Sequence, residues 1–163
     1  MATKHKKRQD IIRYYKEQTG QTDVDMREAA KWAAKKNLIK LPKPTDPIDI
    51  LAKQFSASAR EETRTDRKSG RPYRVNHMFP GFQGEQKVHL WCDIDDPSTT
   101  REKIHKSLIM RREQMVGDGV QLTFDAMHWN SIHPKEEPIE IPMDFEPDVE
   151  WAMNTPNEES EAS

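Results

Sequence analysis

The sequence contains a single cysteine, Cys92, and no apolar run near the ~18 residues that a membrane span needs. One cysteine excludes an intramolecular disulfide and is typical of a reducing compartment. The charged N-terminus is followed by no apolar segment, which argues against a secretory signal. We therefore expect a cytoplasmic protein, or a nuclear one in a eukaryotic cell.

Signatures of catalysis are also scarce. There is no Gly-rich phosphate loop, and the Ser, His and Asp residues lack contexts that activate a nucleophile. Glu85-Gln86-Lys87, with Asp66 upstream, resembles the spacing of some metal-dependent nucleases, which we carry as an alternative. His89 and Cys92 fall on opposite faces of a predicted strand, so they are not expected to share a metal ion. We expect no catalytic residue, no metal site and no cofactor.

Hydrophobic residues make up 34% of the 163 residues, charged residues make up 33%, and the mean hydropathy is −1.00. This composition predicts one domain with a modest core, plus an extension. The charge changes sign along the chain. Residues 1–75 contain 19 Lys/Arg against 10 Asp/Glu, whereas residues 134–163 contain 1 against 10. The two ends therefore favour different partners.

Residues 1–8 are interpreted as a basic arm that is disordered when free. Residues 9–19 predict a first helix, with an apolar face and a stop at Gly20. A second helix follows, capped by Asp23 or Asp25.

A third helix begins at Asp46-Pro47-Ile48-Asp49, which offers an Asp cap, a Pro at the first helical position and an acid in the first turn. Apolar residues then recur on one face, and basic residues lie opposite them as far as Arg67. Lys68-Ser69-Gly70 breaks the pattern.

Two strand-like runs, Arg71 to Met78 and Lys87 to Ile94, predict a β-hairpin whose loop contains Pro80, Gly81 and Gly84. Three helices followed by a hairpin resemble winged-helix DNA-binding domains, over roughly residues 9–95. The resemblance implies that the third helix enters the major groove and that the hairpin contacts the DNA backbone or minor groove.

Basic residues gather across the end of the third helix and the root of the hairpin, and spacings of three and four place several on one side. Such residues bind phosphates without choosing a sequence, whereas Lys53, Ser56 and Arg60 are better placed for base edges. Glu61 and Glu62 favour the alternative of a charged, solvated helix face. The candidate nucleic-acid contacts are Lys6, Lys7, Arg8, Lys53, Ser56, Arg60, Arg64, Arg67, Lys68, Arg71 and Arg74.

A long helix is predicted within residues 96–133. Thr99 and Glu102 are spaced as a capping box, and apolar residues recur every seven positions as far as Trp129. The repeat crosses Gly117-Asp118-Gly119, which favours one continuous helix. The alternative ends the helix near position 116 and makes residues 120–124 a strand.

Residues 134–163 combine five prolines with many acids and are interpreted as an extended tail. Its apolar residues between Ile139 and Trp151 either pack on the long helix or dock on a partner. As an acidic segment, the tail could also compete with nucleic acid for the basic residues. The candidate partner contacts are Leu108, Met115, Leu122, Trp129, Phe145 and Trp151.

The sequence thus predicts an α+β fold, mainly α, with a winged-helix-like domain over residues 9–95, a long helix and an acidic tail. The predicted function is non-enzymatic, regulatory binding of duplex DNA. The first alternative is an adaptor or assembly factor that binds a protein partner, or a second copy of this chain, through the long helix and tail. No membrane partner is expected.

Overall fold

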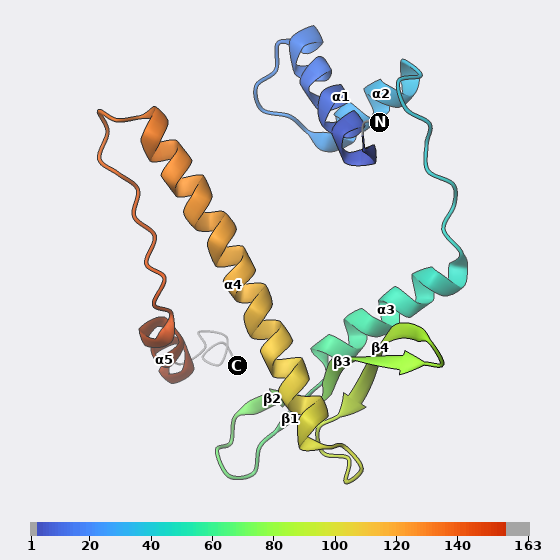
Figure 1. Ribbon diagram of the computed structural model, residues 1–163, viewed down its shortest axis with the longest axis vertical. Helices are drawn as coiled ribbons and strands as arrows, with labels where there is room; N and C mark the ends of the chain where they lie inside the picture. The colour runs from blue at the N-terminus through green and yellow to red at the C-terminus, as the bar shows by residue number, and fades with distance from the viewer. Residues whose placement is uncertain (1–2, 156–163) are drawn as a thin grey trace, which may run out of the picture. The chain divides into compact units, whose positions relative to one another are not determined.

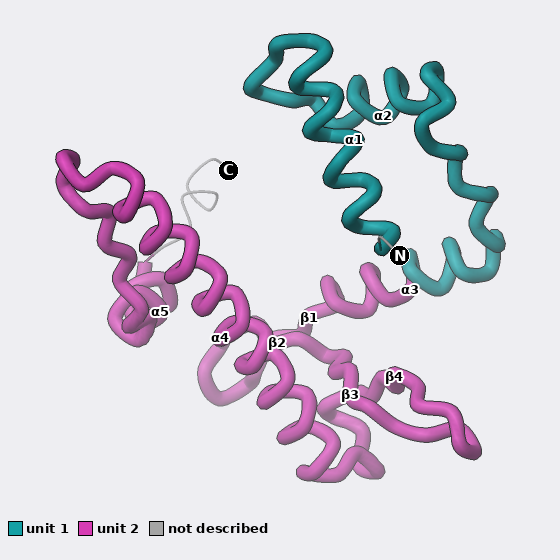
Figure 2. The backbone as a smooth tube through the Cα atoms, turned by 45° about the horizontal axis from the view of Figure 1, so that its top comes forward, with its two compact units in different colours: residues 1–54 teal, residues 55–163 magenta. Residues whose placement is uncertain are grey.

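Helices and two small antiparallel hairpins build the chain, which the computed structural model describes over residues 3–155 (Figure 1). More than half of the described residues are helical, so the predicted mixture of helix and sheet, mainly helix, is confirmed. The chain forms two compact units, residues 1–54 and residues 55–163 (Figure 2). The division falls inside the segment 9–95 that the sequence assigns to one domain.

The first unit is centred on two helices, α1 (Lys4–Thr19) and α2 (Met26–Lys35). Tyr15 and Ala33 are buried between them, and the rings of Tyr15 and Trp32 meet edge to face at 5.3 Å. The small alanines of α2 let the helices approach closely enough for this aromatic contact. Asp25 caps α2, since its carboxylate accepts the backbone N–H of Arg27 at 2.8 Å.

The first helix begins earlier than predicted. Thr3 is its N-cap, because the Thr3 hydroxyl accepts the backbone N–H of Lys6 at 3.1 Å. Residues 4–8 are therefore helical, and the prediction of a disordered arm is wrong for them; residues 1 and 2 lie outside the described residues. The helix ends as predicted at Gly20, whose φ of 70° suits glycine.

The third helix, α3 (Pro47–Glu61), starts as predicted, with the Asp46 carboxylate accepting the Ile48 N–H at 3.0 Å. The prediction that it continues to Arg67 is wrong. Thr63–Thr65 forms strand β1, which pairs with β2 (Pro72–Arg74) in an antiparallel hairpin. Two threonines favour extended backbone, and pairing with β2 outweighs the helical spacing of the arginines.

The second hairpin joins β3 (Asn76–Gln83) to β4 (Gln86–Asp93) through the two-residue turn Gly84-Glu85. Gly84 has a φ of 63°, as such a tight turn requires. The predicted hairpin is confirmed in part: β4 matches the second predicted strand, but the first predicted strand, Arg71 to Met78, is divided at Val75 between β2 and β3, and the loop is shorter. Pro80 and Gly81 lie in β3 rather than in the loop. An edge strand tolerates proline, and the bare Gly81 backbone makes room for the side chain of Leu90, which lies diagonally across the ladder, two residues beyond its partner Val88.

Val75 links the two hairpins. Its N–H donates to Glu62 at 3.1 Å, its carbonyl accepts from Ile94 at 2.9 Å, and its side chain is 1% exposed. Phe79 and His77, both buried, extend this small core along β3. These two backbone hydrogen bonds therefore fix the chain at Val75, between β2 and β3.

The long helix, α4 (Arg101–Ile132), is continuous through both glycines, which confirms the preferred prediction over a strand at residues 120–124. Its cap differs by one residue. Thr100 accepts the Lys103 N–H at 3.4 Å, while the Thr99 hydroxyl donates to the carbonyl of Asp93 at 2.6 Å. Thr99 is thus used to fasten the helix start to β4. Ser107 is buried, and it lines a cavity together with residues of β3 and β4.

The tail turns back along α4 (Figure 1). The Asn130 side chain bonds both backbone groups of Ile139, at 2.8 and 2.9 Å, and a methyl group at Gly119 would lie 3.8 Å from Met143 Sδ. The tail therefore packs on α4, which is the first of the two alternatives that the sequence left open. The prediction of an extended tail is wrong for residues Glu146–Asn154, which form helix α5. Pro147 and acids in the first turn are the local signal for that helix.

None of the helices within residues 3–155 is both long and apolar enough to cross a membrane.

Candidate nucleic-acid interface

The predicted nucleic-acid contacts fall in both units. Lys6, Lys7 and Arg8 lie in the first turns of α1, where Lys6 forms an ion pair with Asp10 that lowers the pKa of that carboxyl. Lys53 lies in α3, within the first unit. Each of these positions is exposed to solvent.

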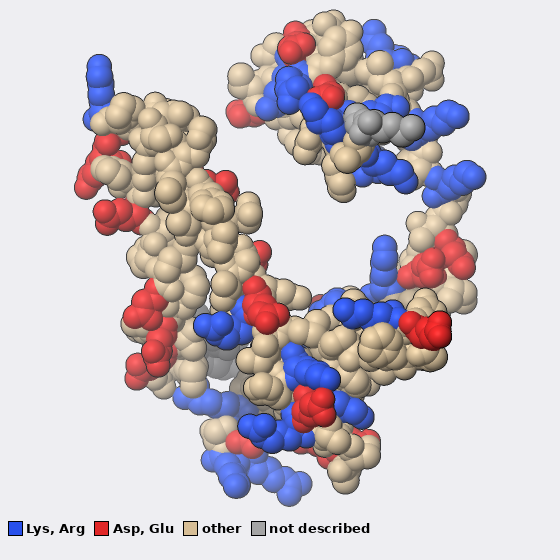
Figure 3. Space-filling view, in the orientation of Figure 1, with Lys and Arg blue, Asp and Glu red and all other residues tan. Residues whose placement is uncertain are grey.

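The second unit holds the larger group. Arg60 lies in the last turn of α3, and Ser56, one turn earlier, is half-buried. The remaining residues belong to the first hairpin rather than to a helix face, namely Arg64, Arg67, Lys68, Arg71 and Arg74. Figure 3 shows Lys and Arg side chains gathered around the hairpins, and Asp and Glu side chains along the tail. We call these five hairpin residues, with Arg60, the basic hairpin region.

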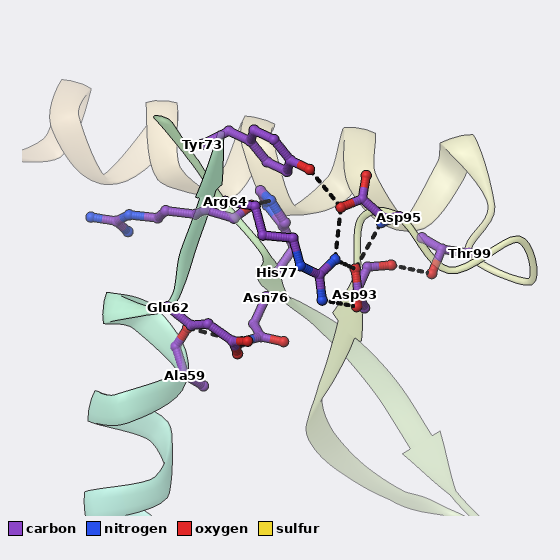
Figure 4. Close-up of polar contacts among 10 residues, drawn as sticks. Ala59, Glu62, Arg64, Tyr73, Asn76, His77, Asp93, Asp95 and Thr99 are labelled. Atoms are coloured by element: carbon purple, nitrogen blue, oxygen red, sulfur yellow. Dashed lines mark hydrogen bonds and ion pairs between the residues drawn. The ribbon is translucent and has the colours of Figure 1, made fainter. Parts of the chain in front are cut away.

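Arg64 is engaged within the protein (Figure 4). Its guanidinium donates two hydrogen bonds to the Asp93 carboxylate, at 2.9 and 3.1 Å, and one to Asp95 at 2.7 Å. The Tyr73 hydroxyl donates to the same Asp95 oxygen at 2.6 Å. This cluster ties the first hairpin to the end of β4, so Arg64 stabilises the fold instead of offering a free charge to a phosphate.

The cluster shifts the pKa values of its members. The Arg64 guanidinium lowers the pKa of Asp93, and the Tyr73 hydroxyl followed by Arg64 lowers that of Asp95. In return, the hydrogen bond to Asp95 raises the pKa of Tyr73, and the two carboxylates raise that of Arg64. The carboxylates are therefore held in their charged form in the folded state.

The cluster should consequently stabilise the folded protein at pH values above the usual pKa of aspartate, and this stabilisation should be lost at lower pH. Carboxyl groups with a lowered folded pKa stabilise the protein above their unfolded pKa of ~3.9, and this contribution disappears as the pH falls through the folded values. We expect Arg64→Gln to lower the melting temperature at pH 7, with a gap to wild type that narrows towards pH 3. Arg67→Gln, a neighbour with no ion pair among the described residues, is the control. An Arg64→Gln gap that is independent of pH would contradict the assignment.

Arg67 and Lys68 occupy the loop between β1 and β2. Asp66 shapes this loop, since its carboxylate accepts the backbone N–H of Ser69 at 2.8 Å and the Ser69 hydroxyl at 2.7 Å. These bonds lower the pKa of Asp66. Gly70, at a φ of 70°, completes the turn. A rigid loop that presents two exposed cations is suited to phosphate contacts.

Arg71 contacts the tail. Its guanidinium donates to the carbonyl of Met153 at 2.5 Å and to Asn154 Oδ1 at 3.2 Å. The tail thus reaches one residue of the basic hairpin region, through a helix end rather than through its acidic side chains. Cationic groups favour the carbonyl end of a helix.

A cavity of about 380 Å³ opens between α3, β3 and α4. Arg60 and Arg74 line it, together with Arg111 from α4. The Arg60 guanidinium lies over the Trp91 ring at 5.5 Å from its centroid, which holds the cation without using its N–H groups. His77 is also in the lining, with Nε2 at 2.9 Å from the carbonyl of Arg74. Asp118 is also in the lining, so three guanidinium groups share the hollow with one carboxylate, and the remaining excess of positive charge attracts anions.

Arg111 and Trp91 were missed as site residues by the sequence pattern, which placed Arg111 on a solvated helix face. Only the packing of α4 beside β3 brings Arg111 near Arg60 and Arg74. Local spacing carries no signal for this, because the residues are separated by two hairpins. Trp91 lies in a predicted strand, but Arg60, the cation over its ring, is 31 positions earlier in the chain, so the sequence gives no signal of their contact.

The predicted partner contacts are exposed within their unit. Leu108, Met115, Leu122 and Trp129 are between 42% and 56% exposed, so the hairpins do not bury them. On the tail, Phe145 lines a groove beside α4, while Trp151 in α5 is 70% exposed.

The residues of the nuclease alternative are not assembled into an ion site. Asp66 lies in the first hairpin loop and Glu85 in the turn of the second. Within residues 3–155, no group of three or more His, Cys, Asp or Glu side chains is arranged to hold a metal ion. Comparisons with protein-family models, curated proteins and solved structures found no match to this chain.

Proposed function

We propose that this protein binds duplex DNA without catalysing a reaction, and that the basic hairpin region is its main contact. The observation that carries the proposal is the convergence of Arg60 and Arg74 with Arg111 around one cavity, together with exposed Arg67 and Lys68 in the loop of the hairpin that carries Arg74. Phosphate oxygens are the ligands that such a group of guanidinium and ammonium groups favours.

The residues have different roles in this proposal. Arg67 and Lys68 contact the DNA backbone from the hairpin loop, while Arg60 and Arg74 direct N–H groups towards a phosphate at the cavity. Arg64 acts indirectly, because its bonds to Asp93 and Asp95 fix the hairpin that carries the other cations. A prebuilt loop loses little conformational freedom on binding, which favours affinity.

A winged-helix-like arrangement is the finer part of the proposal. Its support is the order of the elements, with three helices followed at once by a β-hairpin. In that arrangement the β1–β2 hairpin acts as the wing on the DNA backbone. Lys53, Ser56 and Arg60 then face the groove from α3.

An adaptor role is the second candidate. It is supported by large apolar side chains that remain exposed on α3 and α5, such as Ile48 at 68%, Phe55 at 66% and Trp151 at 70%. Exposed apolar patches of this kind mark protein contacts. The adaptor needs no nucleic acid, so DNA binding separates the two candidates.

The experiment that tests the proposal is incubation of the intact chain with a fluorescently labelled duplex at low salt, with and without Mg²⁺. We expect a rise in fluorescence anisotropy and a duplex that stays intact in both conditions. A duplex that is cut when Mg²⁺ is present would replace the proposal with the nuclease alternative. No rise in anisotropy would favour the adaptor.

A further inference from the structure

The long helix α4 carries more apolar surface than its own chain covers. Leu108, Met115, Leu122 and Trp129 are spaced by seven residues, which returns each to nearly the same side of the helix. Their exposed fractions of 47%, 56%, 42% and 44% leave about half of each side chain open to solvent. We call these four residues the α4 seam.

The neighbouring faces of α4 are already occupied. Ser107 and Met110 lie towards the hairpins, where Ser107 is buried and both line the cavity beside β3. Gly119 and Asn130 lie beneath the tail, which contacts them through Met143 and Ile139. The seam lies between these two faces, and its Met115 lines both the cavity beside β3 and the apolar groove between α4 and the tail. It is therefore a free strip bounded by fixed structure.

Charge along α4 is arranged to match a copy of itself running in the opposite direction. Residues 101–116 contain five Lys/Arg and two Asp/Glu, whereas residues 117–132 contain two Asp and no Lys or Arg. A parallel copy would bring like charges together. An antiparallel copy sets the basic half against the acidic half and also opposes the two helix dipoles.

We propose that the α4 seam binds the α4 seam of a second copy of this chain in an antiparallel, two-fold symmetric dimer. Leu108 then faces Trp129 of the partner subunit, and Met115 faces Leu122 of the partner subunit. Both pairs are centred on the same point, between Asp118 and Gly119, as a two-fold axis requires. The same register places Arg111 within one residue of Asp125 of the partner subunit. This proposal does not depend on DNA binding.

Sedimentation equilibrium of the full chain tests the proposal. We expect a mass of twice 19.1 kDa at micromolar concentration, and the single-chain mass for Leu122→Asp. Gln121→Asp places the same charge one residue away, off the seam, and should remain dimeric. A wild-type chain that stays monomeric at ~100 μM, well above ordinary dimer dissociation constants, would overturn the proposal.

Exchange of the charges at positions 111 and 125 provides a second test if Leu122→Asp fails to fold. Arg111 and Asp125 are both exposed, so their replacement should leave the fold intact. Arg111→Asp and Asp125→Arg should each weaken dimerisation about tenfold or more, since they set like charges against each other across the axis. The double variant should recover most of the loss. If both single variants dimerise as strongly as the wild type, the antiparallel register is contradicted. The same holds if the double variant dimerises no more strongly than the single variants.

Discussion

A chain that ends after Pro134 should melt at a lower temperature than the full chain. Four apolar tail residues, Ile139, Ile141, Met143 and Phe145, are 39–47% exposed and so bury about half of their surface. Full burial of such a side chain contributes roughly 1.5–3 kcal/mol, so half-burial of four contributes about 2–5 kcal/mol after allowance for a compact unfolded state. For a unit of this size we expect a fall of roughly 10 °C.

A second truncation provides the control. A chain that ends after Thr155 loses three acidic residues outside the described part but keeps every described tail contact. Its melting temperature should match that of the full chain. The chain that ends after Pro134 could instead melt like the full chain and bind DNA more tightly. The tail would then be a tethered competitor for the basic hairpin region and not a packed element.

Replacing Arg67 and Lys68 together by glutamate should weaken duplex DNA binding tenfold or more at low salt. Each residue removes one phosphate contact and adds a repelling charge, and a charge-assisted hydrogen bond contributes about 1.5–3 kcal/mol. The loop itself should survive, because Asp66 and Ser69 hold it through their own bonds. Fluorescence anisotropy measures the affinity, and circular dichroism checks the fold.

The matched control changes net charge by the same amount elsewhere. Lys87 in β4 and Lys135 after α4 are exposed and lie outside the basic hairpin region. Their double replacement by glutamate should reduce affinity much less. Equal losses in the two double variants would mean that net charge alone governs binding and would remove the hairpin from the account.

Several elements could be predicted because their signals are local. Gly20 ends α1, Asp46 with Pro47 begins α3, and β4 follows the alternating pattern of its residues. The end of α3 could not be predicted in the same way. Arg64 and Arg67 keep helical spacing with Arg60, but pairing of Thr63–Thr65 with a strand seven residues later decides the backbone. Long-range pairing is not encoded in local spacing.

The candidate site was predicted in part. The basic residues near the first hairpin were identified from charge and spacing, but their individual roles depend on tertiary contacts. Arg64 is committed to Asp93 and Asp95, and Arg71 to the end of α5. Arg111 joins the cavity only because α4 passes beside β3. An arginine's neighbours, not its charge, determine whether it is available to a ligand.

The salt dependence of binding between the intact chain and duplex DNA shows how many DNA phosphates the protein neutralises. A plot of log affinity against log salt concentration has a slope of about −0.9 for each phosphate that the protein neutralises. If Arg60, Arg67, Lys68, Arg74 and Arg111 each neutralise one phosphate, we expect a slope of about −4.5. An affinity that is undetectable at low salt, or a slope near zero, would contradict the account.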